Sequence, residues 1–194
     1  MKRIEFLKRL KKLNKPYYTV SDLQMILGQD RAVTRKEIHR FAKSGILKRI
    51  GRNVYVTPLF SYDIEEAAAN LHTPCYLSFE SALSKYGVLS QIPYTITFAT
   101  LRRPKKITLG NQEIEYRKLK HEFFFGYKRL ENLLIAEPEK ALLDELYFVS
   151  RGKAKIDIDE LDLAEIDVEK LKTYSKRFPA YVRPLITQIC SLKR

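Results

Sequence analysis

The spacing of apolar residues in the first third of the chain predicts a series of short helices. Residues 2–13 place Ile4, Leu7 and Leu10 at helical spacing, opposite a face of lysines, which predicts an amphipathic helix. Residues 17–20 then have the pattern of a short extended segment. Ser21, followed by Gln24, has the pattern of a capping box and predicts the start of a second helix.

A third helix and a hairpin follow within residues 34–56. Thr34 and Glu37 form a second capping-box pattern, which predicts that the third helix begins at Thr34 and ends near residue 44. Two β-branched runs, 46–50 and 54–56, flank a glycine-containing turn and predict a β-hairpin. This order of elements predicts a winged helix-turn-helix over residues 1–58, whose third helix and hairpin would read duplex DNA.

The remaining residues, 59–194, predict a mixed α/β domain that ends in helices, so we expect the α+β class for the whole chain. Three consecutive aromatics, Phe123 to Phe125, cannot all point inward from one strand, because neighbouring side chains face opposite ways. Either two layers enclose that strand or one ring is exposed at an interface. The predicted helices are 59–74, 78–86, 137–149, 168–177 and 180–192, and the predicted strands are 95–100, 106–109, 113–119, 123–127 and 133–136.

Positive charge is concentrated in the predicted winged helix. Residues 1–58 hold 15 Lys and Arg against 4 Asp and Glu, whereas residues 59–194 hold 21 against 19. Such asymmetry points to a polyanionic partner for the first segment. The sequence shows no secretory signal and no apolar run of membrane-spanning length, and Cys75 and Cys190 lack metal-site spacing, so we expect a cytoplasmic protein with idle thiols and no membrane partner.

The third predicted helix carries cations opposite its apolar face. Recognition helices contact bases chiefly through their N-terminal residues, which favours Arg35, Lys36 and His39 for base contacts, with Arg40 and Lys43 on the backbone. A solvated basic helix face is the alternative interpretation. The candidate DNA-binding residues are Thr34, Arg35, Lys36, His39, Arg40, Lys43, Arg49, Arg52 and Asn53.

The chain offers no recognisable catalytic, metal or cofactor motif, so we expect no enzyme activity, metal or cofactor. The three histidines are isolated from one another and from acids at ligand spacing. Asp144 and Glu145 sit on a helix whose other residues are apolar, which is a weak signal for a nuclease. A possible second basic patch, or simply a solvated turn, is formed by Arg102, Arg103, Lys105 and Lys106.

Several segments, in order along the chain, resemble the AbiEi-type antitoxins of bacterial abortive-infection systems. The wing segment 45–55 follows that family's phrase G-x-L-x-R-x-G-x-G-x-Y, with Asn53 where glycine is usual. Asparagine tolerates left-handed backbone, so the turn is retained. Segment 18–23 also resembles the family's winged head, segment 77–87 is similar to its small-residue helix, and segment 135–144 is similar to its A-x-P-E-K-A-L-x-D phrase.

The resemblance implies a type IV antitoxin with a role in phage defence. Such a protein represses its own operon by binding promoter DNA, which we expect to carry inverted repeats. Its C-terminal region counters a co-encoded nucleotidyltransferase-like toxin, with direct contact left open. Two alternatives remain from the residues alone: a winged-helix regulator that senses a small ligand, and a nuclease delivered by a winged helix.

Overall fold

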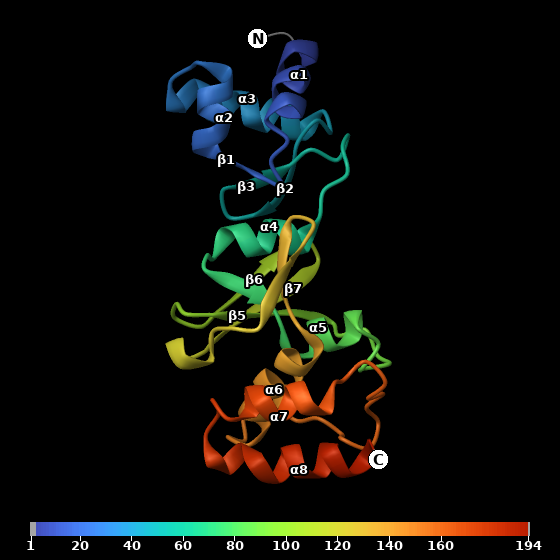
Figure 1. The fold of residues 1–194 in the computed structure, drawn as a ribbon. Coiled ribbons are helices and arrows are strands. Elements are labelled where there is room, and N and C mark those ends of the chain that lie inside the picture. Colours follow the sequence, from blue (N-terminus) through green and yellow to red (C-terminus); the bar gives the residue numbers. More distant parts are fainter. Residues whose placement is uncertain (1–2, 194) are drawn as a thin grey trace. The chain divides into compact units, whose positions relative to one another are not determined.

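The computed structural model describes residues 3–193 and has a mixed α+β fold, with eight α-helices and two sheets over that range (Figure 1). The chain forms two compact units. The first unit runs to Ala67 and includes Thr108–Asn111. The second unit contains Ala68–Ile107 and the chain from Gln112 onward.

The first unit contains the helices and the hairpin in the order that the sequence predicts. Two strands, β2 and β3, form the hairpin, and β1 pairs antiparallel with β3 to complete a three-stranded sheet. The elements are α1 (Arg3–Leu13), β1 (Tyr18–Thr19), α2 (Val20–Leu27), α3 (Arg31–Lys43), β2 (Lys48–Gly51) and β3 (Val54–Val56).

The core of the first unit is apolar and joins all three helices. Phe6 of α1 stacks on Phe41 of α3 with ring centroids 4.2 Å apart, and Leu23 of α2 is fully buried beside them. The inward stripe of α1 is centred on Phe6 and Leu10. Ile4, which the spacing placed on that stripe, is 70% exposed, because it lies half a turn from Phe6 and therefore points to the opposite side of the helix.

The N-cap of helix α2 lies two residues before the predicted cap. Thr19 is its N-cap: the Asp22 N–H donates to Thr19 Oγ1, and the Thr19 N–H donates to the Asp22 carboxylate. The predicted Ser21 capping box is therefore wrong, since Ser21 already lies inside the helix. Gly28, with φ of +65°, closes α2 in left-handed backbone, as the sequence predicts.

The second unit is built on a six-stranded sheet in the order β6-β7-β5-β4-β9-β8. Strands β4 and β9 are parallel, as are β5 and β7, whereas β4–β5 and β8–β9 are antiparallel. The strands are β4 (Cys75–Leu77), β5 (Thr95–Thr100), β6 (Lys105–Leu109), β7 (Gln112–Lys118), β8 (Tyr127–Leu130) and β9 (Leu133–Ala136). The sequence analysis missed β4, because three consecutive buried residues show no alternation.

The helices of the second part of the chain lie largely where the sequence predicts them. Helix α5 packs on β5 and α6, and α7 packs on α6 and α8 (Figure 1). The helices are α4 (Ile64–Leu71), α5 (Phe79–Lys85), α6 (Pro138–Val149), α7 (Val168–Ser175) and α8 (Arg183–Leu192), with short 3-10 helices at His121–Phe123 and Ala180–Val182.

The predicted strand over residues 123–127 is wrong. A 3-10 helix ends at Phe123, and β8 begins only at Tyr127. Because the backbone is not extended, the three aromatic side chains reach different partners: Phe123 stacks on Phe178, Phe124 lies against Tyr76, and Phe125 meets Tyr174 edge-on. Phe123 is buried and the other two rings are half-buried, which explains the aromatic run without an exposed ring.

The structure also describes the two cysteines and the length of the helices. Cys75 and Cys190 are free thiols, and burial raises the pKa of Cys75 to about 12, which keeps that thiol protonated at neutral pH. Among the helices of residues 3–193, none has the length and apolar character to span a bilayer.

Candidate nucleic-acid interface

The helix α3 presents a cationic face whose position depends on where the helix begins. Asp30 is the N-cap, and its carboxylate accepts hydrogen bonds from the N–H groups of Ala32 and Val33. The helix therefore starts three residues earlier than predicted, and the predicted Thr34 cap is wrong. Thr34 lies on the core-facing side of α3 and is fully buried, so its side chain is not part of the exposed face.

The predicted cations of α3 are all exposed. The core-facing residues Thr34, Ile38 and Phe41 occupy one stripe of the helix, which leaves the remaining positions to solvent. The exposed members of the predicted set are Arg35, Lys36, His39, Arg40 and Lys43. Arg40 pairs with Glu37 at 2.6 Å, so one of these charges is partly neutralised within the helix.

The β2–β3 hairpin carries the other predicted residues on its strands and turn. Asn53 lies in the turn with φ of +60°, the left-handed backbone that asparagine adopts at low cost. Arg49 on β2 is exposed, and its Nε–H donates to the Gly51 carbonyl at 3.1 Å, which orients the guanidinium along the turn. Arg52 is exposed at the tip.

A concave surface of about 290 Å³ lies between α3 and the hairpin, and four predicted residues line it together. Arg35 and His39 come from α3, whereas Arg49 and Asn53 come from the hairpin. Its other lining residues are Val20, Ile38, Ala42 and Tyr55, and no acid is among the eight. Lys36, Arg40, Lys43 and Arg52 do not line this surface.

Two further residues belong to this region although the sequence did not predict a role for them. Tyr55 lies directly across the hairpin from Arg49, so the two side chains share one face of the sheet. The sequence predicts the hairpin but not its register, so the pairing of Tyr55 with Arg49 could not be predicted from it. Arg31 is an exposed cation in the first turn of α3, and it was missed because the predicted helix began after it.

The possible second basic patch lies in the second unit, at the start of β6. Arg102 and Arg103 are exposed in the loop before that strand, and Lys105 and Lys106 are its first two residues. Lys106 pairs with Glu115 of β7 at 3.1 Å. Burial lowers the pKa of the neighbouring His72, and the charges of Lys105 and Arg102 lower it further, although a hydrogen bond to the Arg103 carbonyl opposes them.

The acids that raised the nuclease alternative are buried in the second unit and have cationic partners. Asp144 pairs with Lys140, and both side chains are fully buried. Glu145 lies 3.2 Å from Arg117, which also binds Glu80. Across residues 3–193 no group of three or more His, Cys, Asp and Glu side chains is placed to hold a metal ion.

No protein-family model matches the chain, and no curated protein matches it.

Proposed function

We propose that the first unit is a winged helix-turn-helix that binds double-stranded DNA, and that the protein represses transcription of its own operon. The observation that carries this proposal is the concave surface on which Arg35 and His39 of α3 face Arg49 and Asn53 of the hairpin. Because no acid lines this surface, a polyanion can approach it without repulsion.

The dimensions and chemistry of α3 suit the major groove of DNA. The groove admits one α-helix, and arginine can bind guanine through two hydrogen bonds. In this proposal Arg35, Lys36 and His39 contact base edges, and Arg40 and Lys43 contact phosphates. The hairpin then acts as the wing, with Arg49 and Arg52 following the backbone or the minor groove.

The primary test is binding of the purified protein to the DNA upstream of its own gene. Arg35→Glu combined with Arg40→Glu should abolish binding, because both side chains are exposed on the proposed contact face. Lys128→Glu combined with Arg129→Glu, on exposed β8 in the second unit, makes the same change in net charge and is the matched control. Equal loss of binding in both double variants would refute a specific interface on α3.

A second experiment separates base contacts from phosphate contacts. Lys43→Gln should lower the slope of log affinity against log salt by about 0.9, the value expected for one lost phosphate contact, and should weaken operator and unrelated DNA alike. Arg35→Gln should weaken operator binding by about 1–3 kcal/mol and reduce discrimination against unrelated DNA. If the two variants behave identically, the assignment of roles along α3 is wrong.

We also propose that the protein acts as the antitoxin of a type IV system in the bacterial cytoplasm. The support for this role is the sequence resemblance over segments 18–23, 45–55, 77–87 and 135–144. The test is co-expression with a nucleotidyltransferase-like toxin encoded beside it. The full chain with Arg35→Glu and Arg40→Glu should still restore growth while the promoter is derepressed. Loss of both activities together would argue against a division of labour between the units.

A further inference from the structure

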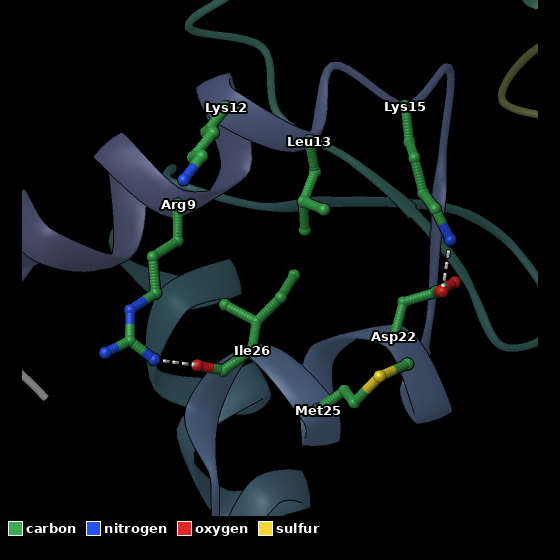
Figure 2. Close-up of a pocket in the computed structure, with 7 residues that line it drawn as sticks. All are labelled: Arg9, Lys12, Leu13, Lys15, Asp22, Met25 and Ile26. Atoms are coloured by element: carbon green, nitrogen blue, oxygen red, sulfur yellow. Dashed lines mark hydrogen bonds and ion pairs between the residues drawn. The ribbon is translucent and has the colours of Figure 1, made fainter.

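A second cavity of about 420 Å³ lies in the first unit, between α1 and α2 (Figure 2). Leu13 of α1 with Met25 and Ile26 of α2 form its apolar floor. The cavity shares no lining residue with the concave surface between α3 and the hairpin. It is therefore a separate feature of the same unit.

Two of the three apolar side chains of the floor remain exposed, although α1 and α2 pack against each other. Met25 is 78% exposed and Leu13 is 48% exposed, although the core of the unit lies directly behind Ile26. Exposed apolar area costs about 25 cal/mol per Å², so covering these side chains would be favourable. Methionine adapts its shape to different occupants, which suits it to a binding surface.

Two polar links span the cavity and lie at its two ends (Figure 2). At one end the Arg9 guanidinium donates to the Ile26 carbonyl at 2.7 Å. At the other end Lys15 pairs with Asp22. Partial burial of Asp22 opposes ionisation, but hydrogen bonds from Lys15 and Thr19 hold the pKa of Asp22 below its ordinary value, so this link stays ionised at neutral pH.

The side chains at the rim of the cavity carry net positive charge, and one of the cations there has no ion-pair partner among residues 3–193. Arg9 pairs with Glu5, and Lys15 pairs with Asp22. Lys12 also lines the cavity, and within residues 3–193 it has no ion-pair partner. An anionic group beside Lys12 would gain a charge-assisted hydrogen bond.

We propose that this cavity binds a small amphipathic carboxylate, with its apolar body on Leu13, Met25 and Ile26 and its carboxylate at Lys12. The volume falls within the range of roughly 300–1,000 Å³ that is typical of small-molecule sites. The links at both ends limit the length of the cleft, which disfavours an extended peptide. A second copy of the chain is disfavoured because it would bring the rim cations of both copies together.

The site lies on the two helices that support α3. Phe6 of α1 stacks on Phe41 of α3, and α2 packs directly on α3. A ligand that changes the spacing of α1 and α2 would therefore shift α3. This consequence rests on the proposed DNA-binding function, whereas the binding itself does not. The site would make the protein a ligand-responsive regulator.

Binding is tested on the full chain without DNA, using decanoate as the probe and calorimetry or amide NMR shifts as the readout. Decanoate below its micellar concentration should bind saturably and shift the amides of α1 and α2. Acetate has the charge without the tail, and decyltrimethylammonium has the tail without the negative charge. Neither should bind detectably. Equal binding of decanoate and decyltrimethylammonium would show unspecific detergent-like contact and overturn the proposal.

Variants locate the site. Met25→Glu should weaken decanoate binding by more than about tenfold, because it places a negative charge on the apolar floor. Lys12→Gln should weaken it by about tenfold or less, because water competes for a charged hydrogen bond at an exposed side chain. Lys8→Gln, an exposed α1 position outside the cavity, is the matched control and should bind like the unaltered protein. All three positions are exposed, so the fold should persist. Undiminished binding by Met25→Glu would place the ligand elsewhere.

A separate measurement addresses regulation. Saturating decanoate should change the affinity for upstream DNA in the unaltered protein and not in Met25→Glu. If decanoate binds in the cavity but the affinity for DNA is unchanged, the binding site is supported and the proposed coupling of the site to α3 is refuted. If no upstream DNA is bound at all, the DNA-binding proposal fails, and the calorimetric result still decides the cavity.

Discussion

The two units of this protein use charged residues in opposite ways. In the first unit the ion pairs lie at the surface, as with Arg40, 55% exposed and bound to Glu37, and the core is apolar. In the second unit Lys140 and Asp144 are both fully buried in one pair, and Glu145 is fully buried beside Arg117. Charge on the first unit is thus available to partners, whereas in the second unit the Lys140–Asp144 pair lies in the interior and links the elements packed there.

Both members of the buried Lys140–Asp144 pair have additional hydrogen-bond partners. Asp144 accepts hydrogen bonds from Tyr76 at 3.0 Å and Ser78 at 2.8 Å, and the Lys140 ammonium donates to both Tyr76 and Asp144. The ammonium also lies 5.2 Å from the centre of the Phe125 ring. Burial lowers the pKa of Lys140, although Asp144 opposes the change. Such a network joins α6 to β4 in one arrangement.

The largest expected effect comes from breaking this pair. Asp144→Ala leaves the Lys140 ammonium buried without its counter-charge, which should cost about 3–5 kcal/mol in the free energy of unfolding. The measurement is urea unfolding followed by circular dichroism. Glu169→Ala, which removes a partner from the exposed Lys172 pair, is the control and should cost less than about 1 kcal/mol.

A double replacement sharpens this result. Lys140→Met with Asp144→Leu removes both charges at similar volume and should be much less destabilising than Asp144→Ala. If the double variant unfolds as easily as the single one, the loss reflects packing and not an uncompensated charge.

The next effect is a pH dependence that belongs to the second unit. Burial and the charge of Glu80 raise the pKa of Glu145 to about 8, although Arg117 opposes them. The folded state therefore holds a proton that the unfolded state releases near pH 4.5. The contribution of Glu145 to the free energy of unfolding is therefore fully present below about pH 4.5, and it is lost as the pH rises through 8.

Glu145→Gln removes that titration. Between pH 5 and 8 the free energy of unfolding of the unaltered protein should fall relative to that of the variant, by roughly 3–4 kcal/mol. The measurement is a series of urea titrations across this range, with Glu113→Gln, at an exposed residue of β7, as the control. A constant difference between Glu145→Gln and the unaltered protein at all pH values would contradict the raised pKa.

A smaller effect is expected in the first unit, where α3 depends on its cap. Asp30→Ala removes the acceptor for two N–H groups and should cost about 1 kcal/mol. Asp30→Ser keeps a capping oxygen and should cost less. Ser21→Ala tests the rejected cap of α2 and should be nearly neutral, because Thr19 and Asp22 form that box.

The smallest effect on stability should accompany the largest effect on binding. Arg35→Glu should change the free energy of unfolding by no more than about 0.5 kcal/mol, because the side chain is exposed. It should nevertheless abolish affinity for upstream DNA. A strongly destabilised Arg35→Glu protein would indicate that α3 uses its cations for folding, and the contrast between the units would disappear.

The sequence by itself determined most elements and the location of charge. Helical spacing identified α1, and the β-branched runs around Asn53 identified the hairpin, because these signals are local in the chain. The alternation of Ile114 and Tyr116 with Glu113 and Glu115 is another local signal, and it coincides with the buried face of β7, where both apolar residues are at most 1% exposed.

Only the tertiary structure decided which distant residues meet. The cap of α3 is Asp30 and not Thr34, because Thr34 lies on the stripe of the helix that packs against the core, and a capping pattern in the sequence does not indicate which side chains the core buries. Strand β4 exists because β5 and β9 bind it from both sides. Lys140 could be assigned to the interior only once Tyr76 and the rings around it were in place, because burying a charge depends on partners that the local sequence does not specify.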